Sequence, residues 1–260
     1  MKIIVCIGQV PDINEIRLDP VTGMPVREGV TVMINPDDKA GLEAALRLKD
    51  ETGAEVSAIT MGPPQADTVL REAMAMGADH AYLITDPVFS GSDTLATSFI
   101  LAAAIKNLEY DLVIVGQQAN DGNTAQIGPQ LAEYLDIPGI SYAKDIKTEG
   151  SSIIVKSQYE DRYHIIRAKM PCLITVLADM NKPRYMTPGR IFEAYLEEKV
   201  IVWGHKEIDI DDGSIGLQGS PTQVTQIFTR KQMADRKKVI LDAEEAANFI
   251  LESLKEKYIL

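Results

Sequence analysis

The sequence predicts an α/β protein built on a mostly parallel, doubly wound sheet, with antiparallel additions and a C-terminal arm that ends in a helix. Apolar, β-branched runs alternate with stretches of helical period through the first half of the chain. After Pro138 this alternation gives way to two β-rich runs around a charged turn. The 260 residues, 45% of them hydrophobic, are enough to bury one large core.

The first strand is KIIVCIG at residues 2–8, a continuous apolar run of the kind that is buried on both faces of a parallel sheet. An irregular segment rich in Pro, Asp and Gly follows at 9–30, with a hairpin turn expected at Thr22-Gly23. Capping residues and apolar spacing then predict helices at 35–53, 63–77, 93–108 and 125–135. Strands are expected between them, at 55–62, 80–86 and 111–116.

The β-rich runs within 151–179 flank a turn near Glu160 and Asp161, and we expect them to join the sheet as antiparallel strands. A helix near 189–198 and a strand near 199–203 complete a domain that we place at residues 1–205. The stretch 209–220 has too few apolar residues to form a core of its own, whereas 242–258 has the spacing of an amphipathic helix. Residues 206–260 are therefore predicted to be a linker and a helical arm that lies against the same sheet or another chain.

The composition excludes several classes of function. A net charge of -12 does not suit a protein that binds the phosphate backbone of nucleic acid. Cys6 and Cys172 lie in apolar runs and are expected to be buried thiols in a reducing compartment. His80, His164 and His205 lack metal-ligand spacing, so no metal site is predicted. No apolar stretch is long enough to span a bilayer and residue 1 leads directly into a strand, so we expect a cytoplasmic protein.

The strongest local signal is the loop in VGQQANDGNTAQIGPQLAE, which joins the strand at 111–116 to the next helix. Ligands of open α/β sheets bind at the carboxyl ends of strands, where backbone N–H groups and a helix N-terminus attract phosphate. Gly122 permits close approach of the backbone, and Thr124 and Gln126 add side-chain donors. Asp-Gly-Asn also forms ordinary turns, with Thr124 as a helix N-cap, so both interpretations stay open here.

Two other strand ends are expected to meet this loop at the same edge of the sheet. They are the residues 35–38, with the sequence NPDD, and the residues 60–63, with the sequence TMGP. We expect all of these loops to lie at one edge of the sheet, where they can hold a single ligand together.

From end to end the chain resembles the beta subunit of electron-transfer flavoproteins. The similarity rests on MINPDDKAGLEAALRLK, AITMGPPQADTVLREAMAMGAD, DLVIVGQQANDGNTAQIGPQLAE and PCLITVLADMNKPRYMT, which occur in that order, and AMGAD and NKPRY are its specific segments. It implies an adenine-nucleotide alpha-hydrolase-like fold without catalytic residues of its own. It also implies an obligate heterodimer with an alpha subunit, which holds an electron-carrying FAD and contacts the arm at 206–260.

The resemblance also implies a set of nucleotide-binding residues at the strand ends. They are Cys6, Asn35, Pro36, Asp37, Asp38, Thr60, Met61, Gly62, Gly116, Ala119, Asn120, Asp121, Gly122, Asn123, Thr124, Ala125, Gln126, Ile127, Gly128, Pro129 and Gln130.

The nucleotide that this resemblance implies depends on the loop. Mitochondrial-type members have an acidic DDDCNQTGQ pattern and bind AMP, whereas DGNTAQIGP looks like anaerobic members that bind a second FAD. We therefore expect FAD, with NADH as electron donor and bifurcation of the electrons. One electron goes to the FAD of the alpha subunit and an acyl-CoA dehydrogenase, and the other to ferredoxin or flavodoxin. The alternatives are an AMP-binding carrier subunit of the same family and a freestanding nucleotide-binding module of the universal-stress type.

The segment ADMNKPRYMT resembles the loop through which the family docks on acyl-CoA dehydrogenases with an exposed apolar anchor. Met180 is the nearest candidate for that anchor, although the loop is shorter before the proline than in mitochondrial members. The implied docking residues are Met180, Asn181, Lys182, Pro183, Arg184 and Tyr185.

Overall fold

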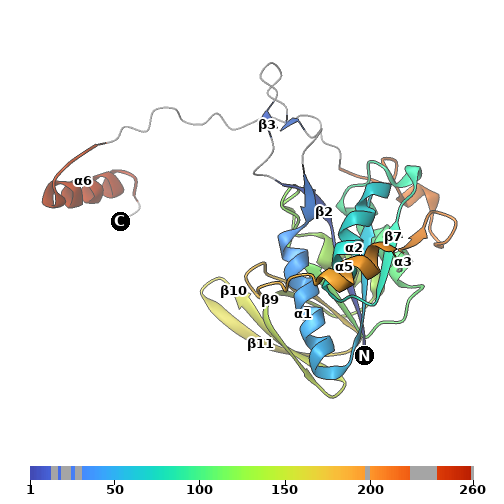
Figure 1. The fold of residues 1–260 in the computed structure, drawn as a ribbon. Helices are drawn as coiled ribbons and strands as arrows, with labels where there is room; N and C mark the ends of the chain where they lie inside the picture. The colour runs from blue at the N-terminus through green and yellow to red at the C-terminus, as the bar shows by residue number, and fades with distance from the viewer. Residues whose placement is uncertain (13–16, 19–24, 27–30, 197–199, 223–238, 259–260) are drawn as a thin grey trace.

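A computed structural model describes residues 1–12, 17–18, 25–26, 31–196, 200–222 and 239–258, and its centre is a nine-stranded sheet (Figure 1). The strands, in spatial order, are β11 (Arg162–Lys169), β10 (Ser152–Tyr159), β9 (Gly139–Glu149), β12 (Cys172–Val176), β8 (Leu112–Gly116), β1 (Lys2–Cys6), β6 (Glu55–Met61), β7 (His80–Ile84) and β13 (Ile201–Trp203). Neighbouring strands from β9 to β13 are parallel, and β10 is antiparallel to both β9 and β11. The predicted α/β fold with a mostly parallel sheet is confirmed.

Helices cover both faces of the sheet, as a doubly wound fold requires. Helices α1 (Pro36–Thr52), α2 (Asp67–Met76) and α5 (Pro188–Leu196) pack on one face, and α3 (Thr94–Ile105) and α4 (Ile127–Leu135) pack on the other. Strand β1 shows why both layers are needed, because Ile3 belongs to the core under α1 while Ile4 belongs to the core under α3. This two-sided burial explains the continuous apolar run at the start of the chain.

Helix α1 is fixed closely over the centre of the sheet. Pro36 starts it, and Gly53 in the left-handed conformation ends it. A Cβ atom at Gly41 would lie 3.1 Å from side-chain atoms of both Ile114 and Val176, so the helix backbone approaches β8 and β12 through this glycine. The first turn of α1 is thereby held at the carboxyl edge of the sheet.

Three elements differ from the sequence prediction. Strand β12 is a central parallel strand between β8 and β9 and not part of an antiparallel hairpin, because all of its residues are buried and it pairs with parallel strands on both sides. Strand β9 was not predicted separately from the runs that follow it. Helix α4 begins at Ile127 instead of residue 125, because Ala125 adopts the left-handed conformation with φ +54°.

The irregular segment after β1 forms paired short strands. Strand β2 (Gln9–Pro11) pairs with β5 (Val32–Ile34), and β3 (Arg17–Leu18) pairs with β4 (Pro25–Val26), each antiparallel. The turn expected at Thr22-Gly23 lies outside the described residues. Short 3₁₀ helices occur at Pro64–Ala66, Pro87–Phe89 and Asp212–Ser214.

The segment after β13 packs on the body of the protein as far as residue 222. Ile208 and Ile215 are buried in the core under α3, and the backbone N–H of Asp93 donates to Ser220 Oγ (2.8 Å). Helix α6 (Ala243–Glu256) has no buried residue and is drawn apart from the sheet (Figure 1). The domain boundary at residue 205 stays a prediction. None of the helices in the described part of the chain is both long enough and apolar enough to cross a membrane.

Candidate functional site

The order of the strands creates a crevice at the carboxyl ends of β1 and β8. From β1 the chain passes through α1 to β6 and then to β7, and it returns through α3, on the other face, to β8 on the opposite side of β1. The connections from β1 and β8 therefore leave toward opposite faces. Such a switch point is where ligands of open α/β sheets bind. The structure brings the ends of β1, β6 and β8 to this one edge.

Asp38 links the two strand ends on either side of the switch point. Its Oδ2 accepts a hydrogen bond from the backbone N–H of Gly8 (2.9 Å), and its Oδ1 accepts one from the backbone N–H of Gly116 (2.8 Å). A Cβ atom at Gly116 would overlap Asp38 Oδ1, so the end of β8 has space for glycine alone.

Asn35 and Asp37 hold the loop that follows β8. Asn35 Nδ2 donates to the carbonyl oxygen of Gln118 (2.8 Å), and its Oδ1 accepts from the N–H of Asn120 (3.2 Å). Asp37 Oδ2 accepts from the N–H of Gln118 (3.2 Å). The side chains that the sequence predicted as nucleotide contacts therefore bond the backbone of the neighbouring loop, and Gly8 and Gln118 are partners that sequence reasoning missed.

Burial shifts the pKa values of the ionisable groups in the crevice. It raises the pKa of Asp38 to about 7, against the opposing effect of the N–H groups that bond its carboxylate. Burial also raises the pKa of Asp37, and burial together with the charge of Asp38 raises the pKa of Cys6 well above its usual range. The Cys6 thiol is therefore protonated at neutral pH, and Asp38 is the group that titrates there.

The tip of the loop between β8 and α4 is open. Residues 121–124 are exposed, and a Cβ atom at Gly122 would meet no described atom within 4 Å. Within the loop, the N–H of Asn123 donates to the carbonyl of Ala119 (2.8 Å), and Asn123 is left-handed with φ +50°. This conformation leaves the backbone of the tip accessible to a ligand.

The N-terminus of α4 is also uncapped by side chains. The N-cap position is occupied by Gln126 and not by Thr124, so the interpretation of Thr124 as an N-cap is wrong. Gln126 makes no side-chain cap in the described structure, because its Oε1 accepts from Thr94 Oγ1 (2.8 Å). The first turn of α4 contains no acidic residue, in contrast to that of α1. Of α1 and α4, the helices whose first turns lie beside the ends of β1 and β8, α4 is the one that can attract an anion.

The remaining predicted site residues have mixed roles. Gly128 is a packing position, because a Cβ atom there would overlap Thr175. Gln130 Oε1 accepts from Ser98 Oγ (3.1 Å). At the end of β6, the N–H of Gly62 donates to the carbonyl of Ile84 (3.1 Å). The other predicted site residues lie at the strand ends, in the loop after β8 and in the first turns of α1 and α4: Pro36, Met61, Asp121, Ala125, Ile127 and Pro129.

Thr60 is distinctive among the residues at the end of β6. Its Oγ1 is buried and has no hydrogen-bond partner among the described residues, and no other buried side-chain nitrogen or oxygen atom of that part of the chain shares this condition. An unpaired buried hydroxyl usually has an explanation in a missing water, ion or ligand.

The segment 180–185 folds back onto α1. The N–H and Nε of Arg184 both donate to Glu43 Oε2 (3.0 and 2.9 Å), and its Nη2 donates to Asp50 Oδ2 (2.8 Å). Asn181 Nδ2 donates to the carbonyl of Ala40 (3.4 Å). Met180 is only partly exposed and packs against the core, whereas Tyr185 is 89% exposed. Tyr185 is thus the prominent apolar side chain of this segment, and Lys182 is exposed as well.

Helix α5 extends this exposed apolar surface. Phe192 is 65% exposed, Leu196 is 76% exposed, and Tyr195 lies under the guanidinium of Arg71 at 5.5 Å. Sequence reasoning identified the helix but not these side chains, although their spacing puts apolar residues on more than one side of it.

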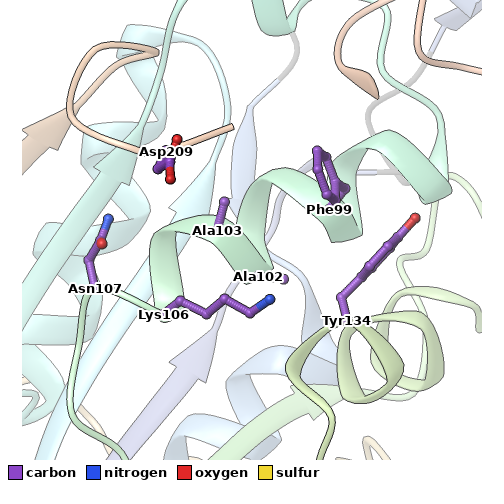
Figure 2. A pocket seen from close by; sticks show the side chains of 7 residues that line it. All are labelled: Phe99, Ala102, Ala103, Lys106, Asn107, Tyr134 and Asp209. Atoms are coloured by element: carbon purple, nitrogen blue, oxygen red, sulfur yellow. The ribbon is translucent and has the colours of Figure 1, made fainter. Parts of the chain in front are cut away.

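A groove on the other face lies between α3, α4 and the segment after β13. Figure 2 shows its lining residues, Phe99, Ala102, Ala103, Lys106, Asn107, Tyr134 and Asp209, around a volume of about 220 Å³. The rings of Phe99 and Tyr134 are 5.3 Å apart. The groove contains none of the predicted nucleotide-binding residues.

The family of the chain follows from sequence comparison. A family model described as the electron transfer flavoprotein domain matches residues 22–197, which include every predicted nucleotide-binding residue beyond β1. The chain belongs to the electron-transfer flavoprotein family. Beta subunits of this family pair with an alpha subunit, and the family binds FAD or AMP.

Curated relatives match this electron-transfer flavoprotein chain over its whole length. It is 46% identical over 260 residues to the electron transfer flavoprotein subunit beta of Clostridium acetobutylicum, which it covers completely. It is 47% identical over 263 residues to the caffeyl-CoA reductase-Etf complex subunit CarD of Acetobacterium woodii, also with full coverage of both chains. Identity to the acryloyl-CoA reductase electron transfer subunit gamma of Anaerotignum propionicum is 42% over 269 residues, again over all of both chains.

Proposed function

We propose that this chain is the small subunit of a bifurcating electron-transfer flavoprotein that holds FAD at the carboxyl ends of β1, β6 and β8. The observation that supports this most is the joining of these loops at one switch point, where Asn35, Asp37 and Asp38 bond the ends of β1 and β8 and the loop after β8. A dinucleotide needs several strand-end loops in fixed relation, and this arrangement supplies them.

The residues at the crevice fit a pyrophosphate. The acids in the first turn of α1 make that helix N-terminus unfavourable for an anion, whereas α4 begins without an acid. In our proposal the open backbone at residues 121–124 and the first N–H groups of α4 bind the phosphates, and Gly122 allows them to approach closely. The unpaired Thr60 hydroxyl is a further donor at the end of β6.

FAD, when bound, supplies the redox chemistry, which is the acceptance of a hydride and the release of single electrons. The chain itself positions the cofactor and surrounds it with a fixed electrostatic environment. We propose NADH as the donor. In this proposal the FAD of the alpha subunit and an acyl-CoA dehydrogenase would receive one electron, and ferredoxin or flavodoxin would receive the other, in the cytoplasm. The names of the relatives from A. woodii and A. propionicum refer to reductases of CoA thioesters, which supports a partner of this class.

The docking surface for the dehydrogenase is proposed to include residues 180–185 and the exposed side of α5. Tyr185, Phe192 and Leu196 supply exposed apolar area, and the bonds from Arg184 to α1 fix the segment that carries Tyr185. Apolar and aromatic side chains on a fixed support are typical anchors of protein interfaces.

Counting nucleotides tests the assignment directly. The chain is co-expressed with its alpha subunit, and nucleotides are extracted with acid and separated by chromatography. We expect two FAD per heterodimer and anaerobic bleaching of flavin by NADH. One FAD and one AMP would replace the bifurcating assignment by the carrier assignment, and a stable monomer that binds ATP without flavin would favour the universal-stress alternative.

A matched pair of variants locates the FAD. Gly122→Asp adds an acid at the open loop tip, and it should lower the flavin content to about one per heterodimer because the acid repels the pyrophosphate. Gly189→Asp makes the same change at another exposed glycine with open space, outside the loop, and should keep both flavins. Equal flavin content in the two variants would show that the phosphates do not bind at this loop.

A further inference from the structure

The buried carboxylate of Asp38 is placed differently from an ordinary helix-capping acid. A helix-capping side chain bonds the N–H groups of its own helix, whereas Asp38 bonds Gly8 and Gly116, which lie 30 and 78 residues away on other elements. Each oxygen accepts one of these backbone N–H groups, the Asn35 side chain is a further donor to the carboxylate, and glycine at position 116 leaves the space that the carboxylate fills. The two N–H groups mark the ends of the strands that border the crevice.

Both hydrogen bonds require the ionised form of the side chain. A carboxylate accepts at both oxygens, whereas a protonated acid has one oxygen that acts as a donor and therefore loses one of the two N–H partners. Protonation of Asp38 should therefore break the link between the ends of β1 and β8. Substitution by Asn has the same effect, because the amide nitrogen cannot accept a hydrogen bond.

We propose that Asp38 is a positioning residue, whose ionised carboxylate holds the ends of β1 and β8 together and thereby places the loop at 117–126 for the nucleotide. This inference rests on the proposed function of the crevice. It adds a residue that acts through the loop without touching the phosphates, and it makes nucleotide affinity respond to pH near neutrality.

Among the ionisable groups around this site, Asp38 is the one expected to change its protonation near neutral pH. On β1 the Cys6 thiol stays protonated, because burial and the charge of Asp38 raise its pKa. On α1 the Asp37 carboxylate is the nearest charge, and it is bonded to the N–H of Gln118. The end of β8 and the loop at 117–120 contain no ionisable side chain. Burial raises the pKa of Asp38 itself to about 7, which is the range in which the pH response should appear.

The cost in stability of ionising Asp38 supports a functional role for this residue. Because burial favours the protonated form, keeping Asp38 ionised above neutral pH lowers the stability of the fold. Groups held at such a cost occur most often at functional sites.

The test uses the intact heterodimer of wild type, Asp38→Asn and Glu51→Gln. Glu51 is exposed on the last turn of the same helix, so its substitution removes one charge from α1 far from the crevice. Dissociation constants for FAD are measured from about pH 8 to about pH 6, and exchange of the Gly8 and Gly116 amide protons is measured in the same samples.

We expect the wild type and Glu51→Gln to lose affinity for FAD as the pH falls through about 7. One of the two amides, Gly8 or Gly116, should lose its protection from hydrogen exchange over the same pH range. Asp38→Asn should bind about tenfold more weakly at pH 8 and show no pH dependence, because its loss of one charged hydrogen bond is permanent. Equal affinities and pH profiles in Asp38→Asn and wild type would overturn the proposal.

The experiment also distinguishes a wrong proposed function from a wrong role of Asp38. A wild-type heterodimer without nucleotide in this subunit contradicts that function and, with it, a positioning role toward the nucleotide. Amide exchange still shows whether Asp38 holds the strand ends: equal protection of Gly8 and Gly116 in wild type and Asp38→Asn would contradict the link itself.

Discussion

Arg184 binds the buried carboxylate of Glu43 with both its backbone N–H and its guanidinium, and so fastens the segment after β12 to the middle of α1. The Glu43 side chain is 5% exposed and that of Arg184 is 31% exposed. A residue that the sequence assigned to docking therefore has a structural bond to the body of the protein, and this bond fixes the segment that carries Tyr185.

Loss of this bond should destabilise the fold. Arg184→Ala leaves the Glu43 carboxylate buried with Arg47 as its remaining ion-pair partner, and we expect the free energy of unfolding to fall by about 2–3 kcal/mol. Denaturation in urea measures the change. Arg162→Ala is the control, because Arg162 and its partner Asp161 are exposed and should contribute less than about 1 kcal/mol. Similar losses in the two variants would contradict a special role for Arg184.

The pH dependence of stability should separate Asp38 from Glu43. The folded pKa of Asp38 is above its unfolded value, so the folded chain binds more protons between about pH 4 and 7 and stability falls as the pH rises through this window. The slope approaches about 1.4 kcal/mol per pH unit and should vanish in Asp38→Asn. Denaturant titrations at several pH values measure it, and parallel curves for the two proteins would refute the assignment.

Glu43 should show the opposite sign. Burial acts to raise its pKa, but the hydrogen bonds from Arg184 and Arg47 hold that pKa below the usual value. Its contribution to stability is therefore present above the unfolded pKa and is lost as the pH falls below about 4.5. Comparison of wild type and Glu43→Gln in acid denaturation measures this loss, which should be absent from the variant.

Gly116 and Gly122 should respond very differently to the same substitution. Gly116→Ala forces a methyl group into the Asp38 carboxylate, within 2.7 Å of the Asp38 backbone nitrogen, and should destabilise the protein by about 3 kcal/mol or more. Gly122→Ala adds a methyl group to open space and should change the free energy of unfolding by less than about 1 kcal/mol. Thermal unfolding of the two variants compares them directly. A stable Gly116→Ala protein would show that the end of β8 can move away from α1.

The docking proposal predicts a selective loss of binding. Phe192→Ser removes an exposed ring from α5 and should weaken association with the acyl-CoA dehydrogenase about tenfold or more, with the melting temperature unchanged. Ile165→Ser is a matched control on the edge strand β11, where the side chain is 69% exposed. Surface plasmon resonance with the immobilised dehydrogenase measures both. Equal affinities would exclude α5 from the interface.

The alternation of strands and helices was predictable because each element up to α4 has its own spacing of apolar residues and its own capping or turn residues at its ends. Strand β12 was misassigned because its parallel pairing depends on β8 and β9, which are distant in the sequence. The start of α4 was misplaced because nothing in the residue type reveals that Ala125 is left-handed.

The strand ends that form the crevice were also predictable, but the bonds within it were not. Asp38 reads as an ordinary first-turn acid, and its partners Gly8 and Gly116 are fixed by topology rather than spacing. Arg184 was likewise assigned to a partner, because its partner Glu43 is 141 residues away.

Helix α6 has a consequence for how the cell makes this protein. Phe249, Ile250 and Leu251 are each about half exposed on a helix without a buried residue. A copy of the chain in which no other surface covers this helix displays these apolar side chains to chaperones and proteases. Copies with an uncovered α6 are therefore expected to be degraded faster than copies in which this helix is covered.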